Sequence, residues 1–370
     1  MMKILYITLE DLSLHKGSVT HIKEIVAGLQ KRGHQVELIG RPWKSIVLSS
    51  LFLLISLFGK LPQYDVIYAR DYHTVILALL PRLFFRKKLV YEINGIANEE
   101  QKLKKDSFLN RILVFLIQKA ERMATKYSER IVSVTPQIGV YLIQNYHCFP
   151  DKAKVIPNGV NTKIFHPIHD ETLLGEWRER LGIRKEEIVI AFVGNLARWQ
   201  GVNILIESAI RLLSRGERLK LLLVGDGPLK KELVRKVMGS GFSKEFIFTG
   251  MIRYEDIPIL INLADICVAP FISRRNRITG VSPLKVFEYM ACGKPVVCSR
   301  IEGLEFIEEE GVGRLTSPED VISLQGELLD LIKNPQKRIM MGNKGLQVAR
   351  EKFDWELKSA LIEKVLKELA

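Results

Sequence analysis

The sequence predicts an α/β protein of two domains, each built on a parallel sheet with helices on both faces. The chain has 370 residues, about twice the length of a typical domain, so each half is long enough to bury its own core. Short β-rich runs alternate with stretches of helical periodicity along the whole chain, which is the pattern of β-α-β units. With 47% hydrophobic and 26% charged residues, the composition is that of a folded chain rather than a disordered one.

The expected strands divide evenly between the two halves of the chain. Each is a short run rich in β-branched or aliphatic residues. In the first half they are residues 3–8, 35–39, 66–69, 88–93 and 130–134. In the second half they are residues 188–193, 220–224, 246–249, 266–269 and 295–298. Two Rossmann-like domains in tandem follow from this spacing.

The join between the domains is expected near Phe165-His166-Pro167. Turn-rich residues precede this point, and a charged helix is expected to start near Asp170. The first domain is therefore residues 1–167 and the second residues 168–352. Residues 353–370 have the pattern of an amphipathic helix that comes too late to join the second sheet, and we expect it to pack back on the N-terminal domain.

Cysteine usage and the start of the chain indicate a cytoplasmic protein. The four cysteines, Cys148, Cys267, Cys292 and Cys298, form no C-x-x-C pair and are too few for a disulfide framework. We expect them to be reduced, buried thiols. The chain begins directly with a strand-like run and shows no signal-peptide pattern.

The net charge of +13 lies almost entirely in the N-terminal half. Residues 1–168 carry 24 Lys and Arg against 13 Asp and Glu, whereas residues 169–370 carry 31 against 29. A basic surface attracts nucleic acid, anionic lipid or a phosphorylated substrate. Nucleic acid is not expected as a partner, because no basic motif interleaved with aromatic residues accompanies the charge.

The apolar run at residues 46–58 has two open interpretations. It spans 13 residues, short of the roughly 20 needed to cross a bilayer as a helix, so no transmembrane segment is predicted. A helix that is apolar all round is usually buried in a core. The alternative is that it lies at a membrane interface, since residues 83–88 repeat the pairing of apolar and cationic side chains.

The most informative stretch for function is residues 280–297. Ser282 is a suitable N-cap and Pro283 suits the first helical position, while Gly293 can end the helix in a left-handed conformation. The stretch therefore predicts a helix over residues 283–292 whose N-terminal amides, including that of Leu284, can bind phosphate.

Lys285 and Glu288 are three residues apart and share one face of this helix. A lysine can pair with phosphate oxygens, while a carboxylate one turn later can accept hydrogen bonds from ribose hydroxyls. The alternative is an ordinary capped helix whose charges point to water, and the spacing alone does not decide between them.

Other strand ends also fall where open α/β sheets bind ligands. Asn195, Arg198 and Gln200 lie in a glycine-containing loop after the first strand of the second domain. In the first domain, Gly17 follows the first strand and Asn94 follows the fourth. The sequence contains no H-E-x-x-H, D-x-D, G-x-S-x-G or P-loop motif, so a metal site, a serine hydrolase and a P-loop NTPase are not expected.

Taken together, these motifs resemble family 4 of the retaining glycosyltransferases, enzymes of the GT-B fold with two Rossmann-like domains facing across a cleft. The resemblance covers nearly the whole chain in content and order. It rests on G-S-V-T-H (17–21), V-I-P-N-G-V (155–160), V-G-N-L (193–196), L-V-G-D-G-P (223–228), F-T-G (248–250) and F-E-Y-M-A-C-G-K-P (287–295).

The resemblance implies a nucleotide-sugar donor, most readily UDP- or GDP-linked, bound mainly by the C-terminal domain, and an acceptor bound by the N-terminal domain. Glu288 matches the glutamate that holds the ribose, and the stretch Ser282, Pro283 and Leu284 matches the region whose backbone amides cradle the diphosphate. Gly17 matches the loop that approaches donor phosphate and acceptor. The resemblance implies neither a metal nor a further cofactor.

Three positions depart from the family pattern. Gly280 stands where the family usually has a second glutamate that contacts the transferred sugar. Asn195 and Gln200 stand where an arginine and a lysine normally clamp the diphosphate, so Arg198, Lys285 or the arginines within 274–277 are expected to supply that charge. Asn94 stands where the family often has histidine, and an amide can position a hydroxyl but cannot act as a base.

The sequence therefore predicts a retaining, metal-independent hexosyl- or glycosyltransferase with Asn94, Lys285 and Glu288 as its catalytic residues. The expected acceptor is a glycan or a lipid-linked precursor of a surface polysaccharide or glycolipid, at the inner face of the cytoplasmic membrane. Two alternatives stay open: a noncatalytic GT-B partner subunit, suggested by the departures, and a nucleotide-sugar epimerase of related fold.

Overall fold

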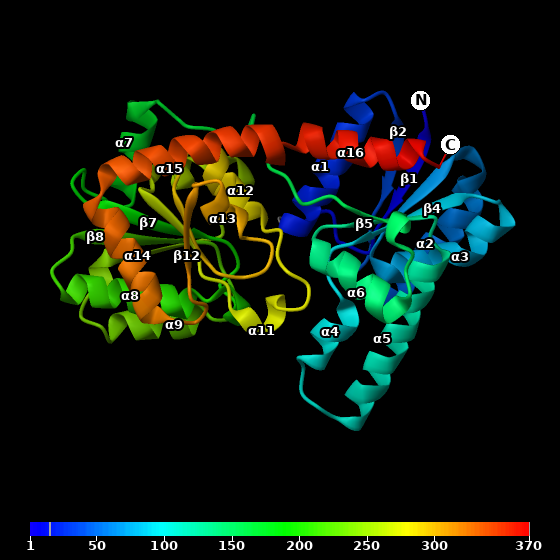
Figure 1. Cartoon of the computed structure of the whole chain (residues 1–370), viewed down its shortest axis with the longest axis horizontal. Coiled ribbons are helices and arrows are strands. Elements are labelled where there is room, and N and C mark those ends of the chain that lie inside the picture. Colours follow the sequence, from blue (N-terminus) through cyan, green and yellow to red (C-terminus); the bar gives the residue numbers. More distant parts are fainter. Residues whose placement is uncertain (15, 370) are drawn as a thin grey trace. The chain divides into compact units, whose positions relative to one another are not determined.

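The computed structural model describes residues 1–14 and 16–369. Within this described part, the chain forms two sheets of six parallel strands each, and Figure 1 follows their elements along the sequence. The chain divides into two compact units. Unit 1 comprises Met1–Gly159, Ile278–Ser282 and Trp355–Ala370, and unit 2 comprises Val160–Arg277 and Pro283–Asp354.

Unit 1 is a sheet in the order β2-β1-β3-β4-β5-β6 with helices packed on it. Its strands are β1 (Lys3–Ile7), β2 (Gln35–Ile39), β3 (Val66–Arg70), β4 (Lys88–Ile93), β5 (Arg130–Ser133) and β6 (Ala153–Val155). Its helices are α1 (Gly17–Lys31), α2 (Ile46–Lys60), α3 (Asp71–Phe84), α4 (Ala97–Lys102), α5 (Phe108–Tyr127), α6 (Pro136–Tyr146) and α16 (Trp355–Lys367).

Unit 2 is a sheet in the order β12-β11-β10-β7-β8-β9. Its strands are β7 (Ile188–Val193), β8 (Leu219–Val224), β9 (Phe246–Gly250), β10 (Ile266–Ala269), β11 (Val296–Ser299) and β12 (Gly313–Thr316). Its α-helices are α7 (Glu171–Arg180), α8 (Val202–Ser214), α9 (Lys230–Met238), α10 (Ile257–Leu263), α11 (Ser273–Asn276), α12 (Leu284–Ala291), α13 (Phe306–Glu309), α14 (Val321–Lys333) and α15 (Pro335–Val348).

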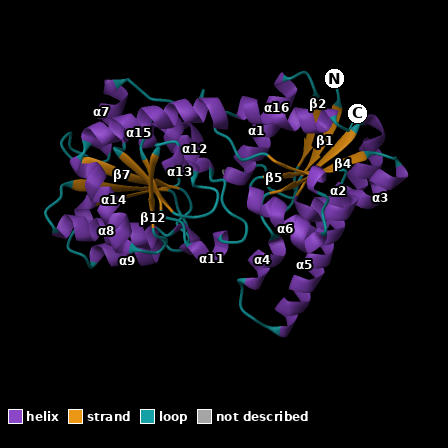
Figure 2. Ribbon diagram, in the orientation of Figure 1, coloured by secondary structure: helices purple, strands orange, loops and turns teal. Residues whose placement is uncertain are grey.

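Each sheet is buried between layers of helices, as Figure 2 shows for each unit by itself. The central strands β1, β3, β7 and β8 are almost wholly buried, which is why their sequences are continuous aliphatic runs rather than alternating ones. The ten expected strands are confirmed, but β6 and β12 were not anticipated. Both are short edge strands whose sequences, Ala-Lys-Val and Gly-Arg-Leu-Thr, carry weak strand signals.

The C-terminal helix α16 packs against α1 within unit 1. Close approach of the two helices requires a glycine, because a Cβ atom on Gly28 would lie 1.9 Å from Ser359 Oγ. Arg32 Nε donates a 2.6 Å hydrogen bond to Glu363 Oε2 and holds the same pair of helices. The first break between the units falls after Gly159, where the expected join was residue 167.

The interpretation of residues 46–58 as a helix buried in the core is wrong. In α2 only Ser49, Leu53 and Leu57 are buried, one stripe that packs on the core of unit 1. All the other large apolar side chains of the helix are exposed, except Leu54, which is partly buried. The segment Ile46–Gln63 is long and apolar enough to cross a membrane by length and composition alone, a test that core helices and signal sequences also pass.

Candidate functional site

The order of the strands places a candidate ligand site at the centre of unit 2. The chain leaves β7 towards β8 on one side, and later strands fill the other side beginning with β10. Such a switch in direction opens a crevice at the carboxyl ends of the two central strands, where ligands of α/β sheets bind. The loop after β7 and helix α12, which follows β10 in the chain, supply the polar groups around this crevice. We call Asn195, Arg198, Gln200, Lys285 and Glu288 the β7–α12 site.

Lys285 is the best-anchored side chain of the β7–α12 site. Its Nζ donates a 2.7 Å hydrogen bond to Gln200 Oε1 and lies 3.9 Å from the ring centroid of Phe192. A Cβ atom on Gly194 would lie only 2.7 Å from the same Nζ. The structure therefore brings together Gln200 and Lys285, which the sequence suggested separately, and shows that the ammonium group rests on an aromatic face.

Glu288 lies one turn further along α12 and makes no side-chain hydrogen bond within residues 1–14 and 16–369. Burial raises the pKa of Glu288 to about 7, against the opposing charge of Lys285. Burial likewise lowers the pKa of Lys285 to about 7, although Glu288 favours its charged form. A half-buried carboxyl group with free acceptor capacity can bind ligand hydroxyls, and paired perturbed groups of this kind are typical of functional sites.

The start of α12 differs by one residue from the expectation. The helix begins at Leu284, with Pro283 in the N-cap position, so Ser282 is not its cap. The Ser282 side chain instead accepts a 2.8 Å hydrogen bond from the Asn158 backbone amide, within unit 1. Gly293 has the expected positive φ, 70°, at the end of the helix.

The remaining expected donor residues lie in two different settings. Asn195 and Arg198 are exposed in the loop after β7, as are Arg274 and Arg277 in and beside α11, while the side chain of Arg275 lies outside the described part. Gly280 and Ser282 belong to unit 1. Gly280 has a φ of 61°, a left-handed conformation that explains a glycine where the family pattern has glutamate.

Unit 1 has a buried polar network at the carboxyl ends of its own central strands. Its centre is Glu92 on β4, whose Oε1 lies 2.7 Å from His21 Nε2 and 3.6 Å from Arg70 Nη1. Asn94 Nδ2 and Tyr6 OH also donate hydrogen bonds to this carboxylate. We call these five residues the Glu92 network.

The charge state of Glu92 is set by competing effects. Burial alone would raise its pKa, but the charge and hydrogen bond of His21, the charge of Arg70 and the Asn94 amide outweigh burial and lower it. Glu92 is therefore a buried anion, held by its neighbours. The other ring nitrogen of His21 lies 2.6 Å from Asn158 Oδ1. Both ring nitrogens of His21 are therefore engaged, and these two contacts fix the orientation of the ring.

The sequence pattern predicted Asn94 as a site residue, but it did not predict Glu92, which accepts its hydrogen bond, or Arg70, which lies beside Glu92. A usable signal was present, because a lone carboxylate inside an aliphatic strand such as Lys-Leu-Val-Tyr-Glu-Ile must be paired when it is buried. The position of His21 on the buried stripe of α1 was a second signal. Gly17 begins α1 but takes no part in this network.

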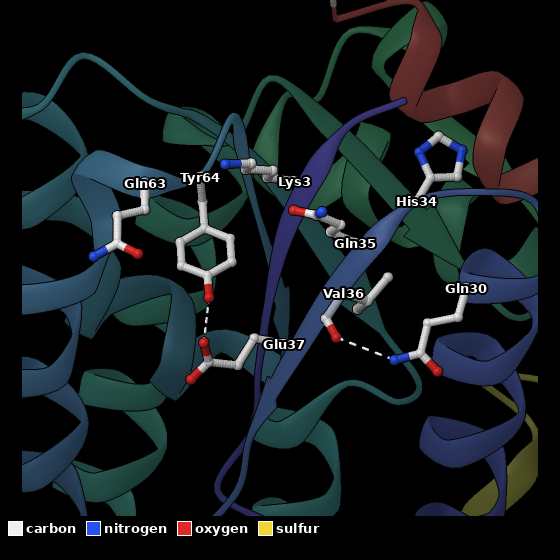
Figure 3. Close-up of a pocket in the computed structure, with 8 residues that line it drawn as sticks. All are labelled: Lys3, Gln30, His34, Gln35, Val36, Glu37, Gln63 and Tyr64. Atoms are coloured by element: carbon white, nitrogen blue, oxygen red, sulfur yellow. Dashed lines mark hydrogen bonds between the residues drawn. The ribbon is translucent and has the colours of Figure 1, made fainter.

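A separate open pocket of about 380 Å³ lies on unit 1, away from the expected site residues. It is lined in part by Lys3, Gln35 and Tyr64, and Figure 3 shows the Tyr64 hydroxyl pointing at Glu37. It includes no residue of the Glu92 network. Among the described residues, no three His, Cys, Asp or Glu side chains are grouped so that they could hold a metal ion.

The fold and the β7–α12 site define a class: α/β proteins of two units that bind ligands at the carboxyl ends of parallel strands. The family comparison narrows this class. Residues 175–348 match the model described as glycosyl transferases group 1, and residues 39–164 match glycosyltransferase family 4. These two matches together cover most of the chain, which belongs to this glycosyltransferase family and is a transferase enzyme.

Two curated relatives illustrate the range of the family. An uncharacterised glycosyltransferase of Methanocaldococcus jannaschii is 24% identical over 92% of this chain and 91% of its own length. A GDP-mannose-dependent α-(1-6)-phosphatidylinositol monomannoside mannosyltransferase of Mycolicibacterium smegmatis is 28% identical over 57% of this chain and 55% of its own length.

Solved structures confirm the GT-B fold. Sucrose-phosphate synthase from Thermosynechococcus elongatus aligns over 100% of this chain and 99% of its own with a TM-score of 0.81 and 18% identity. HepE from Anabaena, solved in complex with UDP-glucose, aligns over 100% of both chains with a TM-score of 0.79 and 20% identity.

Proposed function

We propose that this glycosyltransferase moves a sugar, with retention and without a metal, from a nucleotide-diphosphate sugar to a glycan or lipid-linked acceptor at the cytoplasmic face of a membrane. The observation that carries the proposal is the Lys285–Glu288 pair. It combines an anchored cation with a carboxyl group that makes no side-chain hydrogen bond among the described residues, at the switch point of the unit 2 sheet.

The proposed donor roles follow from this chemistry. Glu288 accepts hydrogen bonds from the ribose hydroxyls. Lys285 and the amides at the start of α12 face the diphosphate, and the exposed Arg198 adds positive charge. A diphosphate favours the charged form of Lys285, so donor binding raises the pKa of that ammonium group. The UDP-glucose in the Anabaena structure and the GDP-mannose named for the mycobacterial relative support a UDP- or GDP-linked donor.

In the proposed reaction, the bond between the sugar C1 and the diphosphate oxygen breaks. The acceptor oxygen bonds to C1 on the same face, and its proton passes to an oxygen of the departing diphosphate. Lys285 and the backbone amides stabilise the charge that develops on the leaving group. Asn94, held by Glu92 in unit 1, is proposed to orient the acceptor hydroxyl.

The acceptor class rests on a different set of observations. The relative from Mycolicibacterium smegmatis is named for a phosphatidylinositol mannoside acceptor. Unit 1 of the present chain carries the basic excess, and α2 exposes apolar side chains. An acceptor anchored in a membrane accounts for both surface features. The absence of a D-x-D motif supports a reaction without a metal.

Donor binding is tested first by thermal unfolding with UDP, GDP, ADP and their sugar conjugates. We expect one nucleotide series to raise the melting temperature of the wild type and not that of Glu288→Ala. Glu186→Ala is the matched control, because Glu186 is an exposed glutamate on the amino-terminal side of β7. If no nucleotide raised the melting temperature, the result would favour the alternative that the protein is a noncatalytic GT-B partner subunit.

The reaction itself is tested with the identified donor and a membrane lipid extract. Transfer of labelled sugar into the lipid phase, unchanged by EDTA and with the anomeric configuration of the donor, is the expected result. An inverted product or loss of activity in EDTA would overturn the corresponding part of the proposal. Conversion of the donor without any acceptor would indicate the epimerase instead.

A further inference from the structure

Helix α2 has an outer face that no described residue of unit 1 covers. Its buried stripe is Ser49, Leu53 and Leu57, spaced four residues apart. Most of the other side chains of the helix are large and apolar, and all of these except the partly buried Leu54 are exposed. Val47, for example, is 78% exposed. Charged residues normally occupy the solvent face of a surface helix, so an outer face of this composition requires an apolar environment.

Helix α5 repeats this pattern, which was not predicted from its sequence. Its inner stripe includes Ile117 and Ala124. On another side, Phe108 and Leu109 are 77% and 76% exposed, and Leu116 is also exposed. Figure 1 shows the start of α5 projecting beyond the sheet of unit 1, with α4 beside it.

The two outer faces belong to one layer of helices. Helix α3 packs against both α2 and α5, and all three contribute to the same core on one face of the sheet. The end of α3 is also apolar and exposed at Phe84, whose ring lies 6.2 Å from that of Phe58 on α2. We call the exposed apolar side chains of α2, α5 and the end of α3 the outer layer.

The charge around the outer layer identifies its partner. Residues 102–126 carry seven Lys and Arg against two acidic residues, and residues 41–63 carry three against none. One of the two acidic residues, Glu121, is buried. Lys119 lies over the Phe115 ring, 4.5 Å from its centroid, so cations border the apolar stripe of α5 directly. Apolar bulk bordered by cations matches an anionic lipid surface, which offers hydrocarbon beneath a layer of phosphate.

The same charge argues against a second copy of the chain as the partner. A symmetric dimer through the outer layer would bring two identical cationic borders together, and like charges at an interface oppose binding. A bilayer carries the opposite charge and has no such cost.

We propose that the outer layer is the surface through which this protein binds an anionic bilayer. The apolar side chains of α2 and α5 enter the headgroup region, and the bordering lysines and arginines pair with lipid phosphates. The inner stripes stay on the core of unit 1, so α2 lies along the membrane rather than across it. This inference rests on the membrane location in the proposed function and adds the elements that make the contact.

The test is co-sedimentation of the full chain with vesicles of equal parts phosphatidylcholine and phosphatidylglycerol, and with vesicles of phosphatidylcholine alone. The wild type is expected to bind the anionic vesicles, and more weakly at high salt. Phe108→Gln with Leu109→Gln in α5, and Val47→Gln with Leu51→Gln in α2, are each expected to weaken binding by about tenfold or more. Glutamine keeps a good helix propensity at these positions.

Ile339→Gln with Met340→Gln in α15 is the matched control, because these neighbours in unit 2 are also exposed and apolar. It is expected to bind as the wild type does. Lys104→Glu with Lys105→Glu tests the charged border without removing any apolar contact, and it is expected to abolish the preference for phosphatidylglycerol. Thermal unfolding confirms that each variant is folded.

Normal vesicle binding by both the α2 and the α5 variants would contradict the proposal that the outer layer contacts the membrane, but not the proposed membrane location. If the wild type did not bind the anionic vesicles, both the outer-layer contact and the membrane location would be contradicted. A dimer in solution that these variants dissociate, together with no vesicle binding, would assign the surface to a second copy instead. Donor binding, read from the nucleotide melts, is independent of all these outcomes.

Discussion

At the scale of single residues, Gly194 controls the space in which the Lys285 ammonium group lies. Its φ of 140° is a conformation that other residues rarely adopt, and a Cβ atom there would lie 2.7 Å from Lys285 Nζ. We therefore expect Gly194→Ala to lower the free energy of unfolding by about 1–3 kcal/mol. It should also displace Lys285 and weaken nucleotide binding. Urea unfolding and nucleotide melts measure the two effects.

Gly175→Ala is the control for this variant. Gly175 lies inside α7, and a Cβ atom there would meet nothing within 4 Å. Alanine at such a position is expected to stabilise the chain by up to about 1 kcal/mol without changing nucleotide binding. If Gly194→Ala behaved in the same way, the close contact with Lys285 would not constrain the site.

Glu92 is the residue on which the polar network of unit 1 depends. Glu92→Gln removes the anion between His21 and Arg70 and leaves the largely buried arginine without its counter-charge. We expect the free energy of unfolding to fall by about 3 kcal/mol near neutral pH. Equilibrium unfolding in urea measures this loss.

The loss of stability in Glu92→Gln should depend on pH. The pKa of Glu92 is lowered in the folded protein from its ordinary value of 4.5. Its contribution to stability is therefore present above pH 4.5 and is lost as the pH falls below that value. The difference in stability between wild type and Glu92→Gln should shrink on acidification below that point. A difference that stayed constant there, or a loss no larger than that of the exposed Glu186→Gln, would show that the charge of Glu92 is not what stabilises the network.

At the scale of the elements, the packing of α16 on α1 explains how the end of the chain becomes part of unit 1. Gly28 faces Ser359, and a Cβ atom on the glycine would come within 1.9 Å of Ser359 Oγ. Gly28→Ala is expected to push the helices apart and to destabilise unit 1 by about 1–3 kcal/mol. Adding Ser359→Gly should restore much of this loss, because it removes the atoms with which the new methyl group collides.

The double variant separates crowding from helix propensity. Alanine is the better helix former, so an effect on α1 alone would make Gly28→Ala stabilising. Ser359→Gly alone is expected to cost about 1 kcal/mol, since it places a glycine within α16. If the two single effects simply added, with no rescue, the contact between the helices would not be the cause.

Most elements were predictable because their signals are local. The strands are short aliphatic runs. The end of α12 follows from Gly293, because a glycine readily adopts the positive φ that ends a helix and Pro295, two residues later, cannot continue it. The start of α12 was missed by one residue because Ser282 bonds to Asn158, which is distant in the sequence. Edge strands β6 and β12 are stabilised by a neighbouring strand rather than by their own composition.

The candidate site was predictable only in part, for the same reason. Lys285 and Glu288 were found because they lie three residues apart on one helix. Their surroundings depend on tertiary contacts, since Phe192 and Gln200 come from a different strand and loop. The exposure of α2 could not be read from its sequence, because an apolar helix has the same composition whether it is buried or lies on a surface.

At the scale of the whole molecule, the two units have separate cores and separate candidate roles. The core of unit 1 lies under α2, α3, α5 and α6, and that of unit 2 under α8 and α14. The candidate donor groups Lys285 and Glu288 are in unit 2, whereas the basic excess and the outer layer are in unit 1. A donor that binds unit 2 should therefore stabilise that unit selectively.

The four tryptophans allow this to be measured. Trp43 and Trp355 are in unit 1, and Trp177 and Trp199 are in unit 2. Replacing either pair with phenylalanine leaves fluorescence that reports one unit. With the identified nucleotide at about one hundred times its dissociation constant, the unfolding midpoint of unit 2 should rise by about 5–10 °C. The midpoint of unit 1 should stay unchanged. Equal shifts in both reporters would mean that the units unfold as one, and a shift in unit 1 alone would place the nucleotide at the Glu92 network instead of at Glu288.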